Sequence, residues 1–135
     1  MSVFDTIRIA ASGLTAERFR MDVAASNIAN QRSTRNAEGT GPYQPVAPFF
    51  QALPMTDDGS QGVAATGLVA IGNGPIRVFD PTHPDADASG FVAYPDVDIA
   101  AQMADLMGAS RSYSMNATVT QAAKQSALDA IELGR

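Results

Sequence analysis

Apolar residues recur with helical spacing through the first thirty residues of the chain. Residues 3–30 contain no proline and a single glycine. Steps of three and four residues place side chains on one face of a helix, so the spacing predicts one long N-terminal helix. The large apolar residues on its stripe are Ile7, Leu14, Met21 and Ile28.

A second helical pattern runs from about residue 96 to residue 133. Pro95 precedes it, no proline follows, and Asp96 or Asp98 is suited to cap its first turn. Small or polar residues occupy much of the stripe, so this helix too offers a narrow apolar face. Its larger positions are Ile99, Met103, Leu106, Tyr113 and Ile131, with Leu128 just beside the stripe.

The middle of the chain changes character between the two helical patterns. All eight prolines lie there, together with short apolar runs at 49–50, 68–71, 76–79 and 91–94. Asn73-Gly74 separates the second run from the third, which predicts a hairpin between them. We expect two to four strands, with a mobile stretch over residues 56–67.

The predicted fold is therefore mainly α, in three segments. Residues 1–35 form the N-terminal helix and its exit, 36–95 a small β-rich and irregular middle, and 96–135 the C-terminal helix. We expect the two helices to form a coiled-coil-like pair, because a narrow stripe suits one long partner helix.

The narrow stripes leave the alanine-rich faces of both helices thinly covered. One interpretation is that neighbouring subunits complete the core, because a lone hairpin buries little surface against the entropy lost on ordering. The other is a self-contained helical hairpin capped by a small sheet. Patterning alone leaves both open.

Charge and composition remove several classes of function. Residues 36–98 carry eight acidic side chains and one arginine, which argues against nucleic-acid binding. The absence of cysteine removes disulfides and thiolate metal sites. Asp5 and Arg8 interrupt the apolar run that a cleaved signal peptide needs, and we expect no membrane span.

The sequence predicts no catalytic, cofactor-binding or metal-binding residue. His83, the single histidine, stands between prolines in a loop without evident partners. Residues 85–96 open like a calcium-binding loop, but position nine is Ala93 and the last ligand is Asp96 where a bidentate glutamate is usual. An aspartate-rich turn is the favoured interpretation, and calcium is the alternative.

The end of the N-terminal pattern resembles the signature of the bacterial flagellar basal-body rod family. That signature has asparagine, an apolar residue, a small residue and asparagine, followed four residues later by threonine. Residues 11–16, 21–23, 80–87, 94–99 and 130–135 add to the resemblance, which covers 3–36 and about 76–135, and the short length is most similar to the proximal rod members. The signature positions are Asn27, Ile28, Ala29, Asn30 and Thr34.

The resemblance implies a structural subunit of the rod, the helical drive shaft that transmits torque for motility. Its partners would be other rod subunits, copies of itself in a helical assembly, and the base adaptor on the inner-membrane ring. Export would run through the flagellar type III apparatus without a cleaved signal peptide, and the protein would lie in the basal body within the periplasmic space. The signature would then act mechanically, with Asn27 and Asn30 bonding free carbonyls or a neighbour and Thr34 fixing the turn.

Two other classes of function compete with this interpretation. A soluble adaptor or export chaperone built as a helical hairpin fits the same patterning. A small metal enzyme using the acidic stretch 80–98 fits it poorly, because no nucleophile or triad spacing accompanies the acids.

Overall fold

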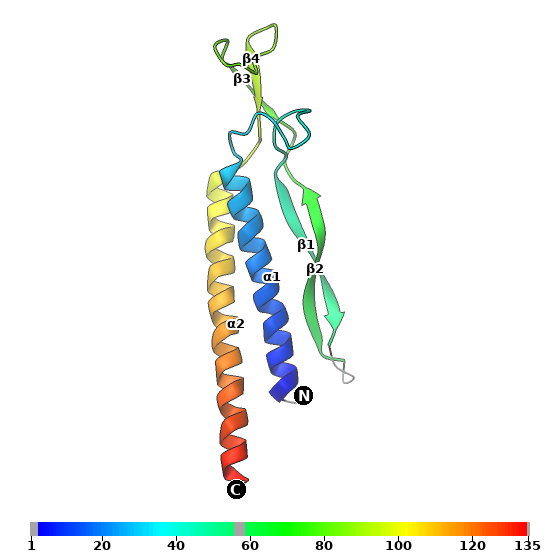
Figure 1. The fold of residues 1–135 in the computed structure, drawn as a ribbon, viewed down its shortest axis with the longest axis vertical. Helices are drawn as coiled ribbons and strands as arrows, with labels where there is room; N and C mark the ends of the chain where they lie inside the picture. Colours follow the sequence, from blue (N-terminus) through cyan, green and yellow to red (C-terminus); the bar gives the residue numbers. More distant parts are fainter. Residues whose placement is uncertain (1–2, 56–58, 135) are drawn as a thin grey trace.

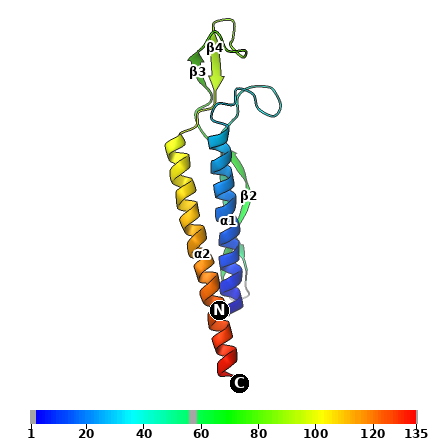
Figure 2. The ribbon, with the colours of Figure 1, turned by 60° about the vertical axis from the view of Figure 1, so that its left-hand side comes forward.

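The molecule is long and narrow, with two helices running side by side along most of its length (Figures 1 and 2). The computed structural model describes residues 3–55 and 59–134. No helix in the described part of the chain is both long and apolar enough to cross a membrane. In chain order the elements are α1 (Val3–Ala29), β1 (Val46–Pro54), β2 (Gln61–Ala70), β3 (Ile76–Phe79), β4 (Phe91–Tyr94) and α2 (Ile99–Leu133).

Both terminal helices form where the patterning predicts them. α1 ends one residue before the expected limit, and α2 begins three residues later than expected. The later start has a local cause, because Asp98 is the N-cap and its carboxylate accepts the backbone N–H of Ala101 at 3.1 Å. The mainly α class with a small β middle is thereby confirmed.

The strands form two separate two-stranded sheets. β1 and β2 pair antiparallel from Val46 opposite Ala70 to Pro54 opposite Gln61, with a bulge in the register. β3 and β4 pair antiparallel in a short finger at one end of the molecule, opposite the C-terminal end of α2 (Figure 1). The β1–β2 hairpin lies along α1, on the side away from α2.

The predicted hairpin across Asn73-Gly74 is wrong. Gly72 and Gly74 have φ of 92° and 95°, left-handed conformations that suit glycine and turn the chain out of the first sheet. Pro75 follows without a backbone N–H to donate, so the segment separates β2 from β3. β2 pairs with β1, which precedes it in the chain, and β3 pairs with β4, which follows it.

The expected mobile stretch over residues 56–67 is also wrong for its second half. Residues 61–67 belong to β2 and pair with β1. Residues 56–58 lie outside the described part of the chain, so the expectation is untested there. Glycine, alanine and threonine suggested a loop, and pairing with the apolar run at Phe49 and Phe50 overrides that weak local preference.

Small residues line the contact between the helices. The buried residues include Ala10, Ala16 and Ala24 on α1 and Ala109 and Ala123 on α2. Gly13 of α1 faces Asn116 so closely that an added Cβ would lie 2.7 Å from Asn116 Nδ2. The backbones approach through alanine and glycine, and bulky side chains are left on the outer faces.

Candidate assembly site

The first asparagine of the signature is the most completely buried polar side chain of α1. Asn27 is 0% exposed and lies in the last turns of the helix. Its Nδ2 donates to the carbonyl of Val46 at 2.8 Å and to Gln102 Oε1 at 2.9 Å. Its Oδ1 accepts the Tyr43 hydroxyl at 2.8 Å and the N–H of Val46 at 3.1 Å.

These four bonds satisfy the hydrogen-bonding capacity of a carboxamide. By bonding both the N–H and the carbonyl of Val46, the Asn27 amide takes the place of a peptide group on a neighbouring strand. It therefore closes the open edge of β1 where the strand begins, while Gln102 ties the same amide to α2. One side chain holds α1, the β1–β2 hairpin and α2 together.

The second asparagine acts within its own helix end. Asn30 Nδ2 donates to the carbonyl of Ser26 at 2.9 Å, and its Oδ1 accepts the hydroxyl of Ser33 at 3.0 Å. The Ser26 carbonyl also accepts the backbone N–H of Asn30, so the side chain adds a second bond to it and shapes the exit of the helix. Of the two residues between the asparagines, Ile28 is half-buried and Ala29 is exposed.

The threonine of the signature reaches across to the finger. Thr34 Oγ1 donates to Asp85 Oδ2 at 2.7 Å, and Arg35 Nε donates to Asp85 Oδ1 at 2.8 Å, with Arg35 Nη2 on the same oxygen. The hydrogen bonds from Arg35 and then Thr34 lower the pKa of the Asp85 carboxyl, and the bond to Asp85 raises the pKa of Arg35. We call these three residues the clasp.

The finger is stiffened by its own aspartate. Asp87 Oδ1 accepts the backbone N–H of Ser89 at 2.8 Å and of Phe91 at 3.0 Å, while Arg77 pairs with its other oxygen. The bond from the Phe91 N–H is the main reason that the pKa of Asp87 is lowered. Arg77 also lies over the Phe91 ring, 5.1 Å from its centroid.

These contacts confirm the aspartate-rich turn. The carboxylate oxygens of Asp85 and Asp87 accept hydrogen bonds from groups of the protein. The described residues contain no group of three or more histidine, cysteine, aspartate or glutamate side chains placed to hold a metal ion. His83 Nδ1 accepts the N–H of Asp85 at 3.1 Å, and its ring meets Tyr94 edge-on. The histidine thus shapes the loop that presents Asp85.

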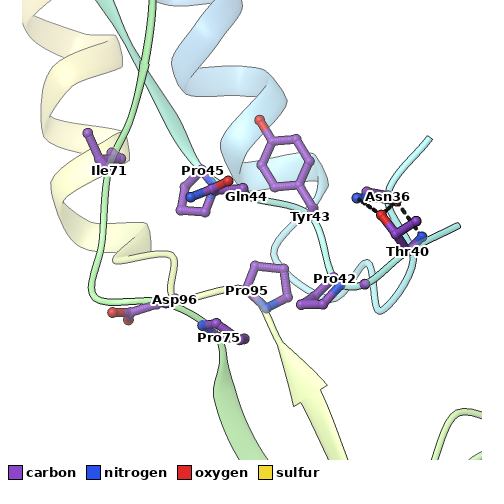
Figure 3. A pocket seen from close by; sticks show the side chains of 12 residues that line it. Asn36, Thr40, Pro42, Tyr43, Gln44, Pro45, Ile71, Pro75, Pro95 and Asp96 are labelled. Carbon is purple, nitrogen blue, oxygen red and sulfur yellow. Dashed lines mark hydrogen bonds between the residues drawn. The ribbon is translucent and has the colours of Figure 1, made fainter. Parts of the chain in front are cut away.

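A small hollow of about 240 Å³ opens where the two hairpins leave the helices (Figure 3). Asp96 is the one charged residue among those that line it, and the Asn36 and Thr40 side chains bond each other at its rim. No general base stands beside a nucleophile within this lining. Three chain segments meet at the hollow, and together they contribute four prolines: Pro42, Pro45, Pro75 and Pro95.

The predicted packing residues are half-buried or exposed within the single chain. On α1 the residues Ile7, Leu14, Met21 and Ile28 are half-buried, as is Leu106 on α2. The other large residues of the α2 stripe project outward, because the inner face is formed by residues one position away. Their exposed fractions are 41% for Ile99, 51% for Met103, 37% for Tyr113, 45% for Leu128 and 63% for Ile131.

Sequence reasoning missed the partners of the signature. Gln102 is buried beside Asn27, and Asp85 receives Thr34 and Arg35. A signal for Gln102 was present, because it is one heptad before the alanine at 109. The buried stripe of α2 includes the small residues Ala109 and Ala123, whereas the large apolar residues that the sequence pattern picks out lie on the neighbouring face of the helix.

Comparison with known proteins connects this architecture to a family. The family model described as flagella basal body rod protein matches residues 7–34, and the model described as flagellar basal body rod FlgEFG protein C-terminal matches residues 88–133. These two segments contain nearly all of α1 with the signature, and the whole of α2. Both models describe proteins of the flagellar rod class.

Curated relatives match along the whole chain. The flagellar basal-body rod protein FlgC of Bacillus subtilis (strain 168) is 33% identical over 150 residues, and that of Escherichia coli O157:H7 is 35% identical over 135 residues, each covering 100% of both chains. The FlgC protein of Borreliella burgdorferi is 33% identical over 141 residues, covering 92% of each chain. The chain belongs to the FlgC family of flagellar basal-body rod proteins.

Proposed function

We propose that this protein is a structural subunit of the flagellar basal-body rod, and that it assembles through the outward faces of its terminal helices. Its membership of the FlgC family supports the first part. The observation that carries the second is the row of large apolar side chains left exposed along α2, from Ile99 to Leu133.

The helix pair alone gives α2 little to pack against. Of the described α2 residues, only Gln102, Ala109 and Ala123 are buried. Helices in proteins owe most of their stability to the packing of an apolar face. Met107 and Met115 are 55% and 61% exposed, and adaptable methionines on an uncovered face favour contacts with other helices.

Assembly into a helical shaft follows from how such surfaces repeat. When two subunits contact each other through different faces, each added subunit leaves the same face open for the next one. If the rotation between successive subunits does not close a ring, the result is a helical filament. Coiled-coil-like packing between the α1–α2 pairs of adjacent subunits would build a stiff tube. Such a tube would transmit torque from the motor for motility.

The proposal also assigns partners and a place in the cell. The partners are other rod subunits and the base adaptor on the inner-membrane ring, and delivery is by the flagellar type III export apparatus without a cleaved signal peptide. The site of action is the rod, within the periplasmic space. A sequence without cysteine suits this route, because no thiol can be oxidised outside the cytoplasm.

The test is to place a charge on the outward face of α2. Met103→Glu should leave the folded monomer intact, because the side chain is 51% exposed, but it should prevent rod assembly because a carboxylate would be buried at the subunit contact. Gln121→Glu, a change at an exposed polar position of the same helix, serves as the matched control. The measurements are swimming motility and the amount of each variant in purified basal bodies.

Normal assembly of Met103→Glu would contradict packing through this face. The adaptor or chaperone alternative makes a different prediction for the native protein, which would fractionate with soluble partners and be missing from purified basal bodies.

A further inference from the structure

Two carboxamides of α2, those of Gln102 and Asn116, each meet α1 at a defined position along the contact between the helices. Asn27 of α1 bonds Gln102 of α2, and Asn116 of α2 fills the space in front of Gly13 of α1. Asn27 and Gly13 are fourteen residues apart on one helix, and Gln102 and Asn116 are fourteen residues apart on the other. Because the helices run antiparallel, both pairs are in contact at the same axial alignment, or register, of α2 against α1.

Apart from these amides and the solvent-exposed Arg20–Asp105 ion pair, which contributes little, the residues of the contact define the register poorly. Ala10, Ala16 and Ala24 of α1 and Ala109 and Ala123 of α2 are buried, and small side chains form shallow surfaces. Small side chains interlock less deeply than large ones, so these alanines offer little steric resistance to sliding one helix along the other. Large interlocking side chains, which usually resist such sliding in helix pairs, are on the outer faces here.

The carboxamides respond to a slide very differently. Gln102 is 8% exposed and Asn27 is 0% exposed, so a shift of either helix leaves two buried amides without their shared bond. The same shift brings Thr6 or Arg20 in front of Asn116, where the native register offers a glycine. A single polar residue at a helix contact is known to specify register in this way.

We propose that Gln102 and Asn116 are positioning residues that set the axial register of α2 against α1, with Asn27 and Gly13 as their counterparts. Because Asn27 also bonds β1 at Val46, the position of the β1–β2 hairpin is fixed relative to both helices. The outward residues of α2 are thereby held at defined heights relative to those of α1. The inference concerns the single chain and stands whether or not the outward faces form the rod contacts.

A cysteine-free chain allows the register to be measured by crosslinking. Arg20→Cys with Asp105→Cys reports the native register, because Arg20 Nη2 and Asp105 Oδ1 are 2.5 Å apart. Arg20→Cys with Ser112→Cys reports a slide of one heptad. A short bifunctional thiol reagent is added to dilute full-length protein, and the intramolecular product is quantified by mass spectrometry.

With the native amides present, the Arg20/Asp105 pair should crosslink and the Arg20/Ser112 pair should not. In a Gln102→Met, Asn116→Ala background, which keeps side-chain volume at 102 and good helix formers at both positions, the ratio of the two products should fall by about tenfold or more. The matched control is Met103→Ala, next to Gln102 but outward-facing, which should leave the ratio unchanged.

An unchanged ratio in the double variant, with helix content preserved, would overturn the proposal, since the amides would then only fill space. If that background loses its helix content, Asn116→Ala alone decides the matter, because it leaves the Asn27 bonds intact. The proposal requires a measurable fall in the ratio for that single change, and a native ratio would refute it.

Discussion

At the scale of single residues, the two asparagines of the signature have unequal roles. Asn27 bonds three other segments from a fully buried position, whereas Asn30 bonds a carbonyl of its own helix and a serine of the exit. The Ser26 carbonyl that Asn30 reaches already accepts the backbone N–H of Asn30. Removal of each side chain should therefore have a different cost.

Asn27→Ala should lower the free energy of unfolding by about 2–5 kcal/mol, because it removes four hydrogen bonds and leaves the buried Gln102 and the partly buried Tyr43 and Val46 without these partners. Asn30→Ala is the matched control and should cost about 1 kcal/mol or less. Urea unfolding of the full chain, followed by circular dichroism, gives both values. Equal costs would contradict the assignment of Asn27 as the central connection.

At the scale of elements, the finger and the helix pair are joined at one main point. Within the described residues β3 and β4 pack on each other and on neither helix, so the clasp of Thr34, Arg35 and Asp85 ties the finger to the exit of α1. Because the pKa of Asp85 is lowered in the folded protein, the clasp contributes its full stability at any pH above the ordinary pKa range of aspartate. The clasp stability is lost only as the pH falls through the lowered folded-state pKa of Asp85.

Finger attachment should thus be constant from neutral pH down to the ordinary aspartate range near about pH 4, and weaken below it. Asp85→Ala should release the finger at every pH, seen as faster proteolysis between the finger and α1 at pH 7. Asp80→Ala, in the same loop but outside the clasp, is the control. A clasp that opened between pH 7 and 5 would show that a different group governs it.

A glycine on the outer side of α2 gives a second test at this scale. A Cβ built at Gly108 meets no atom within 4 Å, so Gly108→Ala should raise the stability of the isolated chain by about 0.5–1 kcal/mol through helix propensity. Gly13→Leu should instead destabilise it by about 1–3 kcal/mol, since the added atoms would force the helices apart. Thermal unfolding of both variants checks the contrast.

Local signals in the sequence were sufficient for the helices and insufficient for the strand pairing. Proline-free stretches and Asp98 located α2 within three residues, because capping and periodicity act along the chain. The apolar runs at 76–79 and 91–94 coincide with β3 and β4, but the partner of β2 depended on the turn at Gly72 and Gly74. The Gln102–Asn27 bond and the clasp join residues at least fifty positions apart, and no local pattern encodes such pairings.

At the scale of the whole molecule, the two ends are built differently. One end carries the finger, the clasp and the Asn27 bonds, where several segments meet. At the other end α2 continues past the start of α1 (Figures 1 and 2), and its last turns expose Leu128 and Ile131. Stability within one chain is therefore graded along its length, with the free end of α2 the part that has fewest neighbours.

This gradient predicts how amide hydrogen exchange should change on assembly. In the isolated chain the amides of the last α2 turns should exchange quickly, while those near Gln102 stay protected, because local opening is easiest where few apolar contacts hold a segment. In assembled rods the same last turns should be protected, since neighbouring subunits would cover Leu128, Ile131 and Leu133. Equal protection in the two states, with the isolated end already ordered, would mean that the chain completes its own core and that its outward faces have another purpose.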